Sequence, residues 1–127
     1  ARLGHPAYDL VSVLQDARRD VSPEVQSQMK ARYITQNNPN PDEFETAYAL
    51  LGAQRNLRIL GVFARLCMRD GKAHYVDLIP RVWSHIETNL AHPALSSIAE
   101  MVLNDLPFPD ETILAKLKSK CATVPHL

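Results

Sequence analysis

Apolar residues recur at helical spacing over a long stretch in the middle of the chain, from Pro41 to Gly71. Apolar side chains three or four positions apart predict one long helix. Asn40 can cap its first turn, Pro41 suits the first helical position, and Gly71 can end it in a left-handed conformation. From Leu57 to Met68 the stretch is apolar on nearly every side. The pattern therefore predicts a central helix that other elements surround.

Five shorter segments carry the same periodicity and predict further helices. They begin at Pro6, Pro23, about Tyr75, Pro93 and just after Pro109, and the first of them ends near Asp16. Pro80 interrupts the third segment, which we expect to be a short turn followed by a helix. The apolar positions expected inside are Leu10, Val13, Leu14, Val25, Met29, Tyr33, Ile34, Tyr75, Leu78, Ile79, Val82, Trp83, Ile86, Leu90, Leu95, Ile98, Met101, Val102, Ile113, Leu114 and Leu117.

No run of alternating apolar and polar residues is long enough to indicate a strand, so the expected fold class is all-α. About six helices would pack around the long central one. The 127 residues fit a single domain with one core, which we place at residues 1–122. Residues 123–127 are expected to form a frayed tail.

The composition argues against several classes of partner. The 14 basic and 14 acidic residues give a formal net charge of zero, so no overall field favours nucleic acid or a membrane surface. The two cysteines, Cys67 and Cys121, indicate reduced thiols in a cytoplasmic protein rather than a disulfide framework. The five histidines show no metal-ligand spacing. The chain begins with Ala1 rather than Met, and we expect it to be a piece of a longer protein.

Two features of the long helix stand out from its apolar background. Arg55, Arg58, Arg65 and Arg69 form one stripe along it. This stripe can be a solvated face, or else a subunit contact or an anion site. Gly52 in mid-helix costs about 1 kcal/mol relative to alanine, so it marks a bend or a close helix crossing.

Four runs of sequence carry a resemblance to a known family. Residues 4–10 read GHPAYDL and residues 14–21 read LQDARRDV. This pattern resembles the aminoglycoside phosphotransferase and choline kinase-like family. Residues 54–66 and 79–83 are similar to its bacterial branch of N-acetylmuramate and N-acetylglucosamine kinases. The resemblance implies the C-terminal, substrate-side helical part of an ATP-dependent amino-sugar kinase, cytoplasmic and active in cell-wall recycling.

The resemblance also implies roles for individual residues. Asp9 corresponds to an aspartate that anchors the catalytic loop, although an acidic residue in a first helical turn is also favoured by the helix dipole. Gln15, Asp16, Arg19 and Asp20 fall on the segment where the family contacts its substrate. We expect Gln15 and Arg19, four residues apart, to share a helical face. The alternative is that this charged segment is only a solvated helix end.

Arg19 stands where related enzymes for cationic aminoglycosides tend to carry an acidic residue. An arginine there would repel ammonium groups, so a neutral or anionic sugar fits better. The lactyl carboxylate of N-acetylmuramate could pair with its planar guanidinium.

Several parts of such a kinase have no counterpart in these residues. They are the glycine-bearing nucleotide lobe, its lysine, the His-Gly-Asp catalytic loop and the magnesium aspartate. We therefore expect ATP and Mg²⁺ to be bound by the parent enzyme, the missing N-terminal lobe to be this chain's partner, and the isolated chain to be inactive. A free-standing helical interaction module that uses the arginine stripe is the alternative. A helix-turn-helix DNA binder is disfavoured by the zero net charge.

Overall fold

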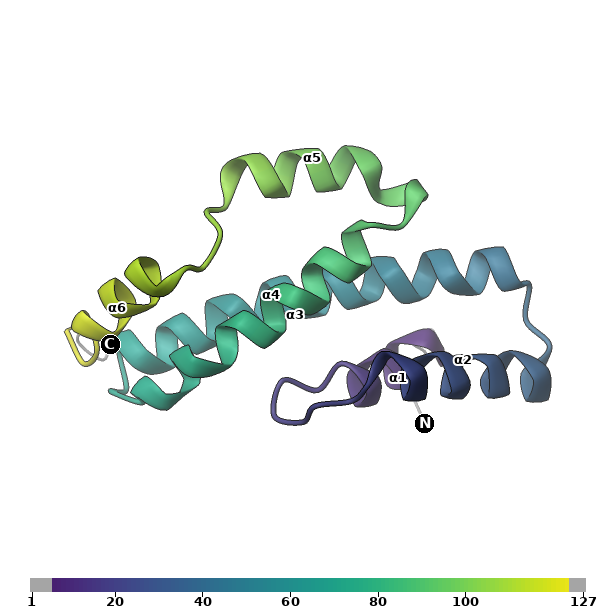
Figure 1. Ribbon diagram of the computed structural model, residues 1–127, viewed down its shortest axis with the longest axis horizontal. Coiled ribbons are helices and arrows are strands. Elements are labelled where there is room, and N and C mark those ends of the chain that lie inside the picture. Colours follow the sequence, from purple (N-terminus) through teal and green to yellow (C-terminus); the bar gives the residue numbers. More distant parts are fainter. Residues whose placement is uncertain (1–5, 124–127) are drawn as a thin grey trace.

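The computed structural model describes residues 6–123, and these residues form helices joined by short connections (Figure 1). Six α helices and two 3₁₀ helices follow one another as α1 Pro6–Leu14, α2 Pro23–Asn37, α3 Pro41–Met68, η1 Ala73–Leu78, α4 Ile79–Leu90, η2 Pro93–Leu95, α5 Ser96–Asp105 and α6 Glu111–Ser119. No strand occurs between residues 6 and 123, which confirms the all-α prediction. Beyond Thr123 the predicted frayed tail lies outside the described residues.

The longest helix, α3, is the element that most of the others contact. It has 28 residues and packs against α1, α4, α6 and both 3₁₀ helices. At its start the Asn40 side chain accepts a hydrogen bond from the Glu43 N–H at 3.0 Å, which is the predicted cap. After its end Gly71 adopts φ +73°, and its N–H donates to the Cys67 carbonyl at 3.0 Å. The signals at both ends of the predicted central helix are thus confirmed.

The expectation that α3 is surrounded is confirmed only in part along its apolar stretch. Phe63 and Cys67 are buried there, but Leu57 and Leu60 are only partly buried, and Gly61 is exposed. Figure 1 shows α4 running alongside α3 while α5 arches away from both. Burial of a helix depends on the number of neighbours as well as on its own apolar faces, and sequence periodicity reports only the faces.

The break before α4 has the form expected from Pro80. Residues up to Leu78 form the 3₁₀ helix η1, and α4 begins at Ile79, so the proline occupies the first turn, where its missing N–H costs nothing. Trp83 is 4% exposed, and Tyr75 packs its ring 5.1 Å from that of Phe63. Both aromatic side chains therefore belong to the core, as predicted.

Several apolar side chains expected inside lie on the surface. The exposed fractions are 62% for Val13, 44% for Val25, 40% for Met29, 36% for Ile98 and 59% for Met101. Neither α2 nor α5 contains a buried residue. α2 is held mainly near its carboxyl end, where Tyr33 stacks on Phe44 at 5.1 Å. None of the helices within the described range combines the length and hydrophobicity needed to cross a bilayer.

The buried apolar side chains form two clusters rather than the single core expected. The amino-terminal cluster joins α1 to the start of α3 and contains Ala7, Val11, Leu14, Phe44 and Tyr48. The central cluster joins the rest of α3 to η1, α4 and η2, and it contains Ala17, Ala49, Ala53, Phe63, Cys67, Val76, Ile79, Val82, Trp83, Ile86, Leu90 and Leu95. Most side chains of the second cluster come from α3 and α4, which pack together along their lengths.

Cys67 and Cys121 are joined by a disulfide, so the prediction of two reduced thiols is wrong. Their sequence separation of 54 gave no local signal for pairing. The pairing follows from the packing of α6 against the end of α3, which also brings the Lys118 ammonium within 2.6 Å of the Asp77 carboxylate. The Ala122 N–H donates to the Cys67 carbonyl at 2.9 Å, and α6 is therefore held by more than the disulfide.

Reduction of this disulfide should destabilise the chain markedly. A cross-link that closes a loop of this length lowers the entropy of the unfolded chain, which is worth about 4 kcal/mol. We expect the urea midpoint of the wild-type chain to fall when dithiothreitol is added. Cys121→Ala is the control, since its midpoint should not respond to the reductant. Equal wild-type midpoints with and without dithiothreitol would show that the disulfide does not stabilise the fold.

Candidate functional site

The segment that links α1 to α2 is the candidate site, because four of the five predicted site residues fall on it. α1 ends at Leu14, since the Asp16 side chain turns back on the chain that follows it. Asp16 Oδ1 accepts hydrogen bonds from the Arg18 N–H at 2.9 Å and from Arg18 Nε at 3.3 Å, and Oδ2 accepts from Nη2 at 3.3 Å. An aspartate that bonds the backbone two residues on competes with helix formation.

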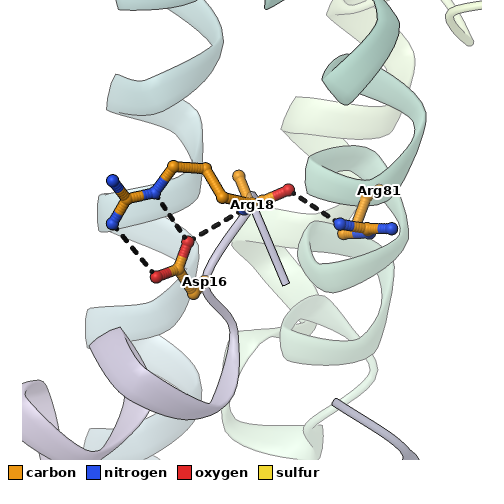
Figure 2. Close-up of polar contacts among 4 residues, drawn as sticks. Asp16, Arg18 and Arg81 are labelled. Carbon is orange, nitrogen blue, oxygen red and sulfur yellow. Dashed lines mark hydrogen bonds and ion pairs between the residues drawn. The ribbon is translucent and has the colours of Figure 1, made fainter. Parts of the chain in front are cut away.

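Figure 2 shows Arg18 folded over Asp16, and Arg81 reaching the same segment from α4. Arg81 Nη1 donates to the Ala17 carbonyl oxygen at 3.0 Å. The Ala17 side chain is 5% exposed and belongs to the central cluster. The segment is therefore fixed to α4 at Ala17, while Arg18, Arg19 and Asp20, which follow the fixed point, are exposed.

The charge on Asp16 is stabilised by its surroundings. The hydrogen bonds from the Arg18 side chain lower the pKa of Asp16 most, and the Arg18 backbone N–H and the charge of Arg55 act in the same direction. Partial burial raises this pKa but does not offset the lowering. Asp16 is thus a carboxylate at neutral pH, already paired with Arg18.

Gln15, directly before this carboxylate, lies at the centre of a buried amide cluster. Its Nε2 donates to Asn89 Oδ1 at 3.0 Å, and its Oε1 accepts from Asn56 Nδ2 at 3.0 Å and from Asn89 Nδ2 at 3.1 Å. The three residues are 1%, 0% and 2% exposed for Gln15, Asn56 and Asn89. They come from the end of α1, from α3 and from α4. The amide cluster therefore ties the start of the candidate site to both long helices.

Gly52 gives this cluster the space it needs. A Cβ at this position would lie 2.7 Å from Asn89 Nδ2 and 2.9 Å from Asn89 Oδ1, closer than such atoms can approach. The glycine therefore marks a close crossing of α3 and α4, one of the two alternatives that its mid-helix position suggested. It lets a hydrogen-bonded asparagine of α4 pack against the backbone of α3.

Two glycines of the same helix provide a matched test of this cluster. Gly52→Ala gains about 1 kcal/mol in helix propensity but crowds Asn89, and overpacking costs about 1 to 3 kcal/mol. We expect a net loss of up to about 2 kcal/mol in the free energy of unfolding, measured by urea denaturation. Gly61→Ala is the control, because nothing lies within 4 Å of its Cβ position. It should stabilise the chain by up to about 1 kcal/mol. Equal effects of the two substitutions would contradict the close crossing.

The predicted site residues separate into buried and exposed groups. Gln15 and Arg19 do not share a helical face, because the helix has ended and Gln15 is buried while Arg19 is exposed. The Gln15 amide is engaged in the amide cluster, so we assign it a positioning role rather than substrate contact. Asp20 is exposed beside Arg19. Asp9 is exposed in the first turn of α1 and pairs with no other described residue.

His85 on α4 is a residue of this region that sequence reasoning missed. Burial lowers its pKa most, the nearby charges of Arg81 and Arg55 lower it further, and Asp20 raises it in part. Its Nε2 is buried without a hydrogen-bond partner among the described residues. His85 is therefore a neutral imidazole at pH 7, next to the candidate site. Of its charged neighbours only Arg81 lies on α4, whereas Arg55 comes from α3 and Asp20 from the segment after α1, so the sequence around His85 did not show its surroundings.

The lowered pKa of His85 predicts a loss of stability in mild acid. Below the ordinary value of 6.5, the unfolded chain binds a proton at His85 more readily than the folded chain does. The free energy of unfolding should therefore fall as the pH drops below about 6.5. His85→Gln should show a smaller fall than the wild type in urea denaturation at several pH values. His74→Gln, at an exposed histidine, should keep the wild-type pH dependence.

The predicted arginine stripe is used partly for packing. Arg58 Nη2 donates to the Tyr8 hydroxyl at 3.0 Å and so links α3 to α1. Arg55 is half-buried, and its Nη1 has no hydrogen-bond partner among the described residues. Arg65 is exposed. The stripe is therefore not a uniformly solvated face.

Magnesium, which the resemblance implies, does not fit the side chains described. Between residues 6 and 123, no group of three or more histidine, cysteine, aspartate or glutamate side chains comes close enough to hold a metal ion. Asp16 is paired with Arg18, and Asp9 stands alone on α1. We therefore derive no reaction step through a metal from this chain.

Known proteins that are similar to this chain carry the same name in several bacteria. The chain is 47% identical over 100 residues to an N-acetylmuramate/N-acetylglucosamine kinase of Caulobacter vibrioides, covering 77% of this chain and 27% of that protein. It is 38% identical over 93 residues to one of Neisseria meningitidis serogroup B, covering 68% of this chain and 28% of that protein. One of Pseudomonas aeruginosa is 40% identical over 65 residues, which is 50% of this chain and 19% of that protein. No protein-family model matches the chain.

These matches confirm the resemblance that residues 4–10, 14–21, 54–66 and 79–83 indicated. The chain is homologous to a part of these kinases and spans between 19% and 28% of the length of the three relatives named. The activity of a whole protein of this kind is therefore a proposal for this chain.

Proposed function

We propose that this chain is the C-terminal, substrate-side helical part of an ATP-dependent kinase that phosphorylates N-acetylmuramate or N-acetylglucosamine. The observation that carries the proposal is the 47% identity over 100 residues to a kinase of that name. The arrangement of the candidate site supports it, since the segment after α1 is fixed by Arg81 and presents charged side chains to solvent. Transferring a phosphoryl group depends mainly on positioning and charge stabilisation, and a fixed substrate segment serves positioning.

In this proposal Arg19 and Asp20 contact the sugar, and Asp16 shapes the segment through its pair with Arg18. Arg19 is exposed and forms no ion pair with another described residue, so its guanidinium is available to a ligand. The planar guanidinium suits a carboxylate, such as the lactyl group of N-acetylmuramate. Asp20 can accept hydrogen bonds from sugar hydroxyls.

Asp9 would anchor the catalytic loop of the parent enzyme. Its carboxylate is exposed near the start of α1 and makes no hydrogen bond or ion pair with a described residue, which leaves it free to accept bonds from another part of the parent. The helix dipole favours a charged aspartate in this first turn in either case. ATP and Mg²⁺ would be held by that other part, and the isolated chain would neither bind ATP nor transfer phosphate.

The proposed location is the cytoplasm, since an ATP-dependent kinase needs a compartment that supplies ATP. A disulfide is unusual there, because cytoplasmic thiols are kept reduced. The bond between Cys67 and Cys121 is therefore an observation that argues against this location.

A protein-interaction module is the second candidate function, and the surface of α5 favours it. Met101 is 59% exposed, Leu103 48% and Phe108 63%, so apolar side chains gather along α5 and the connection that follows it. Exposed apolar residues of this kind are typical of contact surfaces. If the chain alone formed a stable assembly in analytical ultracentrifugation and the parent gene lacked a catalytic loop, this candidate would replace the kinase.

Substitution of Arg19 tests which sugar the site prefers. In the complete enzyme Arg19→Ala should lower kcat/KM for N-acetylmuramate more than for N-acetylglucosamine, because only the former offers a carboxylate. A charge-assisted hydrogen bond is worth about 1.5 to 3 kcal/mol, so the selectivity should change roughly 10- to 150-fold. Arg32→Ala on the exposed side of α2 controls for a general loss of positive charge. Equal losses on both sugars would place Arg19 away from the substrate.

A further inference from the structure

A groove with uncharged polar groups in its walls lies between α2 and α4 and has no role in the site described so far. Two adjoining cavities of about 210 and 280 Å³ form it, and both are lined by Lys30, Tyr48 and Thr88. Together they reach the range of roughly 300 to 1,000 Å³ that is typical of small-molecule sites. α2 contributes side chains to the wall of this groove but contains no buried residue.

The groove exposes more apolar than polar surface, and most of its polar lining residues are uncharged. The cavity nearer the candidate site is lined by the amide of Gln26, the hydroxyls of Ser27 and Thr88 and the imidazole of His85, and by Gln15, whose amide is already engaged in the amide cluster. The other cavity adds Asn89 and His92. Amides, hydroxyls and neutral imidazoles both donate and accept hydrogen bonds, which matches the hydroxyl and amide groups of a carbohydrate.

The charges in the groove cancel one another. Lys30 Nζ lies 2.6 Å from Glu45 Oε1, and both residues line the second cavity. The same ammonium lies 4.3 Å from the centre of the Tyr48 ring. Since this cation and this carboxylate neutralise each other, the groove favours a ligand without net charge. It differs in this respect from the segment that carries Arg19.

Two polar atoms in the walls lack hydrogen-bond partners. The Tyr48 side chain is 5% exposed, and its buried hydroxyl has no hydrogen-bond partner among the described residues. The buried Nε2 atom of His85 also lacks a partner there. Burial, and to a smaller extent Glu45, raise the pKa of Tyr48 to about 12, so the phenol remains a donor at neutral pH. Buried polar groups in native proteins are normally satisfied by protein, water or ligand.

The groove adjoins the proposed substrate segment at one end. Gln15 lines it and directly precedes Asp16 in the chain. His85 lines it as well, and Asp20 is close enough to influence the titration of this imidazole. A ligand that reaches from the segment into the groove would therefore pass from charged to uncharged surroundings.

We propose that the groove between α2 and α4 binds the uncharged pyranose ring of the amino sugar, with its hydroxyl and acetamido groups. This inference rests on the proposed function and adds a second contact region to it. The ring is common to both sugars, whereas Arg19 meets the carboxylate that only one of them carries. Ser27, Tyr48 and Thr88 then contribute to the binding of both substrates.

Filling the groove provides the test. Ser27→Trp places a large side chain in the groove from α2, which has no buried residue to disturb. In the complete enzyme it should lower kcat/KM at least tenfold for both N-acetylmuramate and N-acetylglucosamine. Gln28→Trp is the matched control on the same helix, since Gln28 is exposed and lines neither cavity. It should leave both values unchanged.

Tyr48→Phe tests the groove without adding bulk. The substitution removes a hydroxyl that has no partner in the free chain, so the melting temperature should stay the same or rise. A lost hydrogen bond to the sugar should nevertheless raise KM roughly 2- to 12-fold for both substrates. This opposite response of stability and affinity is not expected of a residue that only supports the fold.

The outcomes of these experiments distinguish a failure of the groove proposal from a failure of the proposed function. If folded Ser27→Trp and Tyr48→Phe enzymes keep wild-type kcat/KM while Arg19→Ala still changes the selectivity, the groove proposal fails and the kinase proposal stands. If the wild-type enzyme phosphorylates neither sugar, the proposed function fails and the groove proposal with it. A loss for Gln28→Trp equal to that for Ser27→Trp would also overturn the groove proposal.

Discussion

The buried amide cluster of Gln15, Asn56 and Asn89 is the constraint on which the arrangement of this chain depends. Three side chains, one directly after α1 and the others from α3 and α4, exchange hydrogen bonds of 3.0 to 3.1 Å and are at most 2% exposed. Apolar contacts tolerate sliding, whereas buried amides must meet in one register or lose their hydrogen bonds. The cluster therefore fixes how α1, α3 and α4 cross, and Gly52 permits the distance at which they do so.

This constraint reaches the candidate site directly. Gln15 is the last residue before the charged segment, and Arg81 holds Ala17 from the same helix that supplies Asn89. Asp16 thus lies in sequence between two residues that are hydrogen-bonded to α4. It accepts hydrogen bonds from Arg18, and these end α1. The side chains that remain free to meet a ligand are those just beyond the second attachment. In physical terms the amide cluster positions the segment, and Arg19 and Asp20 provide its chemistry.

Local signals made the helices predictable, but tertiary contacts decided what they bury. Asn40, Pro41 and Gly71 bound α3 through interactions with their own neighbours in sequence, and these ends were found where predicted. Periodicity identifies the apolar face of a helix but not whether another element covers it, and Met101 and Val25 are therefore exposed against expectation.

The candidate site shows the same contrast between what local sequence signals predict and what tertiary contacts decide. Its place in the chain followed from the resemblance carried by residues 4–10 and 14–21. Gln15 is buried against Asn56, 41 positions away, and the pKa of His85 is lowered by burial and by Arg55 of α3 as well as by Arg81 of its own helix, so no local pattern contains all of these groups. The pairing of Cys67 with Cys121 was missed for the same reason, since it depends on where α6 packs.

The two proposed contact regions together account for how one site could accept two sugars. Relatives of this chain are named for both N-acetylmuramate and N-acetylglucosamine, and these sugars share an acetamido pyranose ring. An enzyme that accepts both must obtain most of its binding energy from the shared ring, because contacts to the lactyl group add affinity for one of them only. The groove, in which Lys30 and Glu45 neutralise each other, suits the uncharged ring that both sugars share. The exposed guanidinium of Arg19 beside it suits the lactyl carboxylate that only one of them carries. Placing the cation in the groove instead would leave a charged group facing an uncharged ring, and its desolvation would weaken the binding of both sugars.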